Sequence, residues 1–386
     1  MKKTIIALAT AAVFATSANA ATVYEQDGTK VEIGGSVRVL LSKEKGKRTD
    51  LKNNDSRLEV NASHDLGNGL SALGGVEIRF DGDDTDESAG KFGNPTTNKL
   101  FAGLGYEGVG TLTFGKQATN GDDVQLNDNS YVWGGNNNLL DSADKSIKFR
   151  SAEWSGFSFG LDYVFGNAEK KHGQVDPQAP LEPEYKYGYQ ASVFYTRELA
   201  QDLTFNWTAG YGVDKEDLDT TKSFADTTAW RTAVQLAYGP VEFGAEYGQS
   251  FYKEQDTKQF TNRSLLVSTS FQVAEPSKIY AQWKQEDFKY NQSVFEDGND
   301  PALGTWREYT LPNSKVKKDT LVVGVDYKLH KNVVTYIEYA YESTRFNLKG
   351  EQYKLENGKE TGNPYTFTRN FKQKDNKIGV GLRVFF

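Results

Sequence analysis

The chain of 386 residues has no cysteine and only three histidines, His64, His172 and His330. The lack of cysteine excludes a disulfide framework, a thiolate nucleophile and a cysteine metal site. The histidines are scattered, and the sequence contains no GxxxxGK[ST] loop. The sequence therefore implies no enzyme activity and no cofactor.

Long apolar runs are also missing. A transmembrane helix needs about 20 apolar residues, and no segment after residue 20 supplies them. The nine prolines are spread thinly and mark no linker. Mean hydropathy is low, at −0.64, yet 21 tyrosines and 23 phenylalanines are present. This composition suits a barrel that turns alternate strand residues to lipid and to water, and also a secreted sugar-binding β protein.

Basic residues are outnumbered by acidic ones. The N-terminus combines Met1-Lys2-Lys3, the apolar run Ile5–Phe14 and the A-x-A site Ala18-Asn19-Ala20, which predicts a secretory signal peptide over residues 1–20. Its removal takes two lysines, so 45 − 2 = 43 basic residues face 52 acidic ones, a net charge of −9. This balance argues against nucleic acid as a partner.

Residues 21–386 form one predicted domain with a repeated pattern. Strand-like runs of about ten residues come in pairs, with a tight turn inside each pair and longer polar stretches between pairs. Sixteen runs are predicted: 31–42, 57–65, 70–80, 98–106, 111–117, 145–151, 157–165, 187–197, 202–211, 229–238, 241–250, 263–273, 278–288, 317–329, 333–345 and 375–386. We expect the long stretches 167–186, 290–316 and 347–374 to be surface loops.

The two faces of these runs differ in chemistry. In 157–165 an aromatic or leucine side chain occupies every second position, from Phe157 to Phe165. The last run ends on the aromatic Phe386. The opposite faces carry charged and amide residues: Arg38, Arg57, Glu59, Asn61, Glu77, Arg79, Lys148, Arg150, Asp162, Arg231, Glu242, Glu246, Glu338 and Arg383. A soluble sandwich would pack that face as its core, whereas buried charge needs water beside it. An even number of strands with this split predicts an all-β fold, a 16-stranded antiparallel transmembrane β-barrel around an aqueous lumen, in contact with outer-membrane lipid.

Five motifs in the same order give the chain a family resemblance. They are Val23-Tyr24 with Asp27–Ile33, Ser56-Arg57-Leu58, Phe101–Tyr106, Lys148–Ser151 and Val380–Phe386. The mature chain resembles the general, trimeric porins of Gram-negative outer membranes. The resemblance implies a water-filled channel for passive diffusion of small hydrophilic solutes and ions, a homotrimer, and a role for Phe386 as an assembly signal for insertion into the outer membrane.

The resemblance also implies a constriction. In such porins the third long loop folds into the barrel and opposes acidic side chains to a basic wall. Here that loop is 117–144, which predicts that Asp122, Asp123 and Asp128 face wall bases. The predicted bases are Arg38, Arg57, Arg79, Lys148 and Arg150. Opposed charges of this kind create an electric field across the width of the pore.

Two alternatives stay open at this stage. The Pro-Glu-Phe-Gly-Gly-Asp segment of enteric porins is absent, with Gly121-Asp122-Asp123 in its place. Each aspartate could therefore cap a turn or a short helix instead of lining the pore. A substrate-specific channel and a barrel-scaffold adhesin are the rival functions. The first would show saturable block by one solute, and the second would bind through its exposed loops.

Overall fold

In the computed structural model the chain is described over residues 20–80, 92–166, 184–217, 224–254, 256–292, 294–300, 304–356 and 359–386. Residues 1–19 of the predicted signal peptide and most of 167–186 lie outside these ranges. Among the described residues no helix is both long and apolar enough to cross a membrane.

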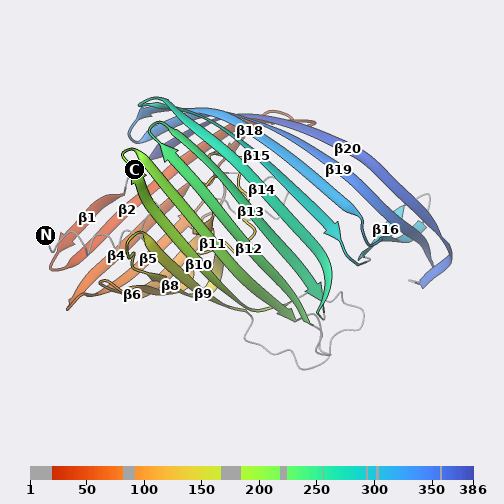
Figure 1. Cartoon of the computed structure of the whole chain (residues 1–386), viewed down its shortest axis with the longest axis horizontal. Helices are drawn as coiled ribbons and strands as arrows, with labels where there is room; N and C mark the ends of the chain where they lie inside the picture. The colour runs from red at the N-terminus through yellow and green to blue at the C-terminus, as the bar shows by residue number, and fades with distance from the viewer. Residues whose placement is uncertain are drawn as a thin grey trace.

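Sixteen strands of the described chain form a closed antiparallel wall (Figure 1). They are β2 (Thr29–Glu44), β4 (Arg57–Gly67), β5 (Leu70–Arg79), β6 (Thr96–Tyr106), β7 (Gly110–Ala118), β8 (Ser142–Ser151), β9 (Phe157–Phe165), β10 (Glu184–Ala200), β11 (Leu203–Asp217), β12 (Phe224–Tyr238), β13 (Val241–Glu254), β14 (Thr257–Ala274), β15 (Ser277–Tyr290), β18 (Lys315–His330), β19 (Val333–Glu356) and β20 (Lys359–Phe385). Each predicted run falls on one of these strands, so the sixteen-stranded prediction is confirmed.

Short turns join neighbouring strands at one end of the wall. The turn from β4 to β5 is Asn68-Gly69, with φ values of 53° and 79°. Asn-Gly favours this left-handed conformation, whose twist matches that of a hairpin. In outer-membrane barrels the short turns lie on the periplasmic side, which places the longer connections at the outer mouth.

The wall is apolar outside and polar inside. On β9, Leu161 and Tyr163 are 49% and 40% exposed, whereas Asp162 between them is buried. Glu77, Arg231, Glu246 and Glu338 are likewise buried. This arrangement inverts that of a soluble protein, because lipid contacts the outer face and the charges collect inside.

The two ends of the chain meet at the closing seam. β20 pairs with β2 from Ser36↔Phe385 to Glu44↔Lys377. The short strand β1 (Ala21–Gln26) occupies the rest of that edge of β2. Between β20 and β1 lies Phe386, whose backbone exchanges hydrogen bonds with Gly35 at 2.9 and 3.2 Å.

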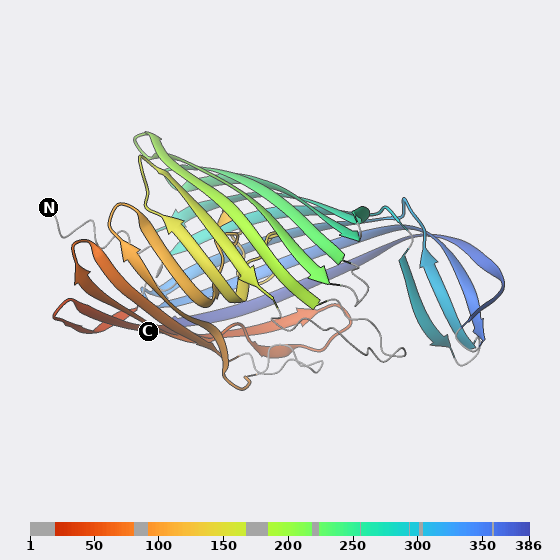
Figure 2. The same cartoon turned by 90° about the horizontal axis from the view of Figure 1, so that it is seen from below.

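Four described strands were not predicted: β1, β3 (Asp50–Asn53), β16 (Val294–Asp300) and β17 (Gly304–Thr310). The expectation of surface loops at 290–316 and 347–374 was wrong. β19 and β20 continue their ladder out to Glu356↔Lys359, and β17 adds to β19. A membrane crossing takes about 9–11 residues, so the 24 residues of β19 extend beyond the bilayer. Figure 2 shows this extension projecting past the rest of the wall.

Candidate pore constriction

Residues 119–141 connect β7 to β8 and contact the inward side chains of many wall strands. The ends of the segment lie together, because the Thr119 amide donates to the Asp141 carbonyl at 2.9 Å. Between them is the short 3₁₀ helix η1 (Asp122–Val124). The segment has no sheet neighbours, so its backbone groups need side-chain partners, and the polar inner face supplies them.

The base of the segment is held by β9 and β10. The Asp162 carboxylate accepts from the Asn120 amide at 3.0 Å and from the Asn120 side chain at 3.1 Å. The Gln190 side chain donates to Thr119 Oγ1 at 3.1 Å and to the Leu140 carbonyl at 3.0 Å. Both limbs of the segment are therefore fixed to the same part of the wall.

The middle of the segment is held by a buried ion pair. Glu246 of β13 accepts from the backbone amides of Leu126 and Asn127 at 2.8 and 2.6 Å. Its other carboxylate oxygen contacts Arg231 of β12, and both side chains are fully buried. Arg231 also donates to Asn138 Oδ1 at 3.4 Å, so this pair anchors the outgoing and the returning limb.

The far end of the segment is held by Glu338 of β19. Its carboxylate accepts from three consecutive backbone amides, those of Tyr131 at 2.7 Å, Val132 at 3.2 Å and Trp133 at 2.9 Å. The Tyr280 hydroxyl donates to it at 2.8 Å. Hydrogen bonds to a charged acceptor are stronger than neutral ones, so one carboxylate fixes the tip of the segment.

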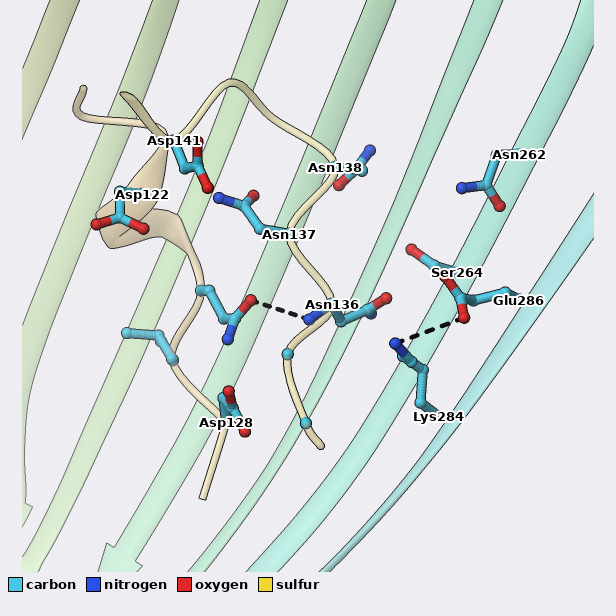
Figure 3. A pocket seen from close by; sticks show the side chains of 14 residues that line it. Asp122, Asp128, Asn136, Asn137, Asn138, Asp141, Asn262, Ser264, Lys284 and Glu286 are labelled. Atoms are coloured by element: carbon cyan, nitrogen blue, oxygen red, sulfur yellow. Dashed lines mark hydrogen bonds and ion pairs between the residues drawn. The ribbon is translucent and has the colours of Figure 1, made fainter. Parts of the chain in front are cut away.

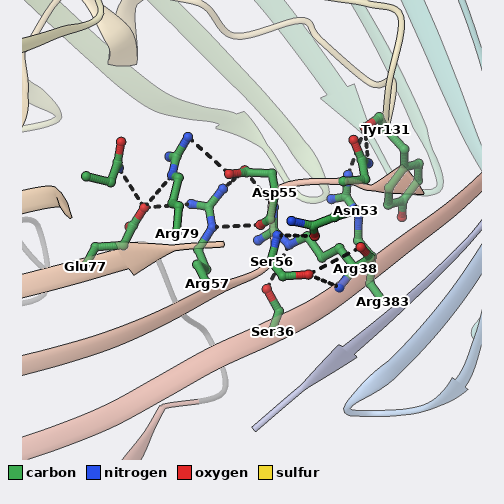
Figure 4. Close-up of polar contacts among 12 residues, drawn as sticks. Ser36, Arg38, Asn53, Asp55, Ser56, Arg57, Glu77, Arg79, Tyr131 and Arg383 are labelled. Carbon is green, nitrogen blue, oxygen red and sulfur yellow. Dashed lines mark hydrogen bonds and ion pairs between the residues drawn. The ribbon is translucent and has the colours of Figure 1, made fainter. Parts of the chain in front are cut away.

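An arginine cluster lies on the wall beside this tip (Figure 4). Asp55, in the left-handed conformation with φ of 70°, directs its carboxylate at three guanidinium groups. Arg38 approaches it at 3.3 Å, Arg79 at 3.1 Å, and Arg57 also contacts it. Arg383 of β20 connects the cluster to the segment by donating to the Tyr131 carbonyl at 2.8 Å.

Glu77 of β5 is the second carboxylate of the cluster. It pairs with Arg79 at 2.8 Å, with Lys99 at 2.8 Å and with Arg57 at 3.5 Å, and its side chain is fully buried. Asn98 donates to it at 2.7 Å. Shared carboxylates keep several cations close together despite their mutual repulsion.

The five predicted wall bases fall into two groups. Arg38, Arg57 and Arg79 share Asp55 in the cluster. Lys148 and Arg150 lie beneath the base of the segment instead, where Lys148 donates to the Ala118 carbonyl at 3.0 Å. Their assignment to the pore lining stays a prediction.

The three predicted acids lie on the outgoing limb. Asp123 pairs directly with Arg150 at 3.1 Å. Asp128 accepts from the Ser130 amide at 3.0 Å, and Asp122 opens η1. Asp128 thus caps a turn, and both Asp122 and Asp128 line a cavity (Figure 3). The assignment of the three acids to the pore constriction stays a prediction.

Local charge and burial perturb Asp122. Burial and, to a smaller extent, the like charges of Asp123 and Asp141 together raise the pKa of this carboxyl to about 6. The residue is nevertheless exposed to water. Asp122 is therefore charged at neutral pH and loses its charge at a higher pH than an ordinary carboxylate does.

We predict a pH-dependent selectivity from this group. Below about pH 6 Asp122 is protonated, so the lumen loses one negative charge and cation preference falls. The reversal potential across a KCl gradient, measured from pH 7.5 to 5, is expected to change with a midpoint near 6. Asp122→Asn should reduce this step, whereas Glu107→Gln, in a short turn, should leave it unchanged. A step of undiminished size in Asp122→Asn contradicts the assignment.

Sequence reasoning missed Asp55 and Lys99. Lys99 was detectable, because alternation along β6 places it opposite the exposed Leu100. Asp55 lies in a connection, where no periodicity applies. The five backbone amides that bind Glu246 and Glu338 carry no signal in the sequence at all.

The chain is similar to known outer-membrane proteins. A family model described as Gram-negative porin matches residues 7–347. The major outer membrane protein of Pasteurella multocida strain Pm70 is 38% identical over 403 residues, which cover 100% of both chains.

Two solved structures share the fold. OmpT of Vibrio cholerae aligns with a TM-score of 0.66 and 19% identity, over 95% of this chain and 100% of that one. A trimer form of OmpT aligns with a TM-score of 0.63 and 18% identity, over 93% and 100%. At these identities the likeness concerns the barrel fold alone.

Proposed function

The chain belongs to the Gram-negative porin family, and from this premise we propose that it lets small hydrophilic solutes and ions diffuse passively through a water-filled lumen. The chain is an outer-membrane channel protein. The observation that carries the proposal is the charged inner face of a closed barrel, for which water is the only compatible filling. Export through a cleaved signal over residues 1–20 is part of the proposal.

We further propose that residues 119–141 narrow this lumen. The contacts to Asp162, Glu246 and Glu338 support this role, because they hold the segment against the inner wall from β9 to β19. Asp122, Asp123 and Asp128 then supply negative charge to the passage, and the arginine cluster supplies positive charge. A field between them orients dipolar solutes and disfavours apolar ones.

Conductance of the purified protein in a planar lipid bilayer tests the channel. We expect large, ohmic current steps in KCl. Steps that arrive in threes would support the proposed homotrimer, for which the trimer form of OmpT is the structural precedent. Absence of conductance from correctly folded protein would refute the channel, and conductance that saturates for one solute alone would favour a substrate-specific pore.

Neutralising the three acids tests the constriction. In the triple variant Asp122→Asn, Asp123→Asn and Asp128→Asn, ion selectivity is expected to shift toward anions, because the passage loses three negative charges while its basic residues remain. The reversal potential in a KCl gradient measures the shift. A matched control neutralises Asp65, near the end of β4, together with Glu107 and Asp202 in short turns. An equal shift in both triple variants would contradict a constriction at residues 119–141.

A further inference from the structure

A cavity opens between residues 119–141 and the wall strands β14 and β15. Its volume is about 560 Å³, within the range of roughly 300–1,000 Å³ that is typical of small-molecule sites. Both limbs of the segment line it, and the wall contributes Asn262, Ser264, Lys284 and Glu286. These four residues lie in the outer-mouth halves of their strands, so a solute entering from outside reaches the cavity early.

Two of the buried side chains that line the cavity each have a polar atom with no hydrogen-bond partner in the described part of the chain. Among the described residues, Asn136 Nδ2 and Ser264 Oγ have no hydrogen bond, although the side chains are only 6% and 3% exposed. Asn262 Oδ1 is unpaired as well. Figure 3 shows the Asn136 side chain directed from the segment toward the strands of Ser264 and Lys284. Unpaired buried polar groups are costly, and a ligand with hydroxyl groups would satisfy them.

The charge of the lining favours a cation. Four carboxylates line the cavity, those of Asp122, Asp128, Asp141 and Glu286, against the single ammonium of Lys284. Lys284 is already paired with Glu286 at 3.4 Å. The three aspartates form no ion pair within the described part of the chain. The lining also includes no aromatic ring on which a flat apolar ligand could stack.

We propose that this cavity captures small hydroxylated organic amines, of which a protonated amino sugar is the simplest example. The aspartates bind the ammonium group, and Asn136, Asn262 and Ser264 hydrogen-bond the hydroxyls. The inference rests on the proposed function, since the solute reaches the cavity through the open channel. It adds a solute class that the channel concentrates at its outer side.

Glucosamine hydrochloride is the probe, added on the side of the long connections to the assembled protein in a planar bilayer. We expect a saturable decrease in KCl current. Uncharged glucose and hydroxyl-free ethylammonium at equal concentration should each be about tenfold less effective, the equivalent of roughly 1.4 kcal/mol. Conductance in KCl without probe tests the channel separately. A normal channel in which glucosamine acts no differently from glucose or ethylammonium overturns the capture site alone.

Paired variants locate the effect. Ser264→Leu fills the cavity and is expected to weaken glucosamine block by about tenfold. Its matched control is Ser270→Leu, equally buried on the same face of β14 but outside the cavity, which should leave block within about twofold. Asp141→Asn at an exposed position does not endanger folding and should also weaken block. Equal block in Ser264→Leu, Asp141→Asn and the unmodified protein overturns the proposal.

Discussion

Deletion of Phe386 is expected to leave export to the periplasm intact and to prevent most of the chain from assembling in the outer membrane. The residue closes the seam: its amide and carbonyl both bond to Gly35. Without it, backbone groups of β2 face lipid with no partner, and each such group costs several kcal/mol in a hydrocarbon environment.

The ring of Phe386 adds packing to this seam. A Cβ placed on Gly35 would lie 2.9 Å from two ring carbons, so glycine there lets the ring lie directly on the β2 backbone. Phe386→Tyr keeps these contacts and is expected to assemble nearly normally. Phe386→Ala keeps only the backbone bonds and is expected to assemble slowly.

Heat-modifiable gel mobility of the outer-membrane fraction measures assembly, and the amount of periplasmic chain measures export. Normal assembly of the deletion variant would refute both the seam role and the predicted assembly signal. If Phe386→Tyr loses as much assembly as the deletion variant, the exact phenylalanine ring is recognised and the seam contact is not what matters.

The wall of the barrel was predictable because lipid imposes a period of two. Leu161 and Tyr163 are exposed on the outer face, whereas Asp162 between them is buried on the inner face. The same alternation recurs in most wall strands. Beyond the bilayer this constraint ends. The outer parts of β19 and β20 meet water on both faces, so their sequence reads as a polar loop although their backbone ladder continues.

The anchoring of residues 119–141 was not predictable for a different reason. Alternation placed Glu246 and Glu338 on the inner face, but their partners are the backbone amides of Asn127 and Trp133, which every non-proline residue possesses. Side-chain identity cannot specify such contacts between residues more than 100 positions apart. The pairing of Asp123 with Arg150 is a contact between two side chains. It too could not be derived from the sequence, because it depends on where the segment leaves the wall.

Glu246→Ala is expected to release the middle of this segment while the barrel still assembles. The substitution removes the acceptor for the Leu126 and Asn127 amides. It leaves Arg231 buried, with Asn138 as its one remaining hydrogen-bond partner in the described part of the chain. Breaking a buried ion pair from one side costs about 3–5 kcal/mol. The strand ladder is unaffected, so the cost falls on the segment and on the neighbouring part of the lumen.

Single-channel current measures the result, and we expect noisier open-channel current with altered conductance. Glu242→Ala is the matched control, because Glu242 lies on the same face of β13. Among the described residues its carboxylate accepts a hydrogen bond from Ser270 alone, at 2.8 Å. That variant should show no extra current noise.

The double variant Arg231→Leu with Glu246→Leu removes both buried charges and is expected to resist heat better than Glu246→Ala, because an unpaired buried charge costs more than a lost pair. It should still be noisy, because the two backbone amides lack their acceptor. Quiet current in Glu246→Ala would mean that Asp162 and Glu338 hold the segment without it.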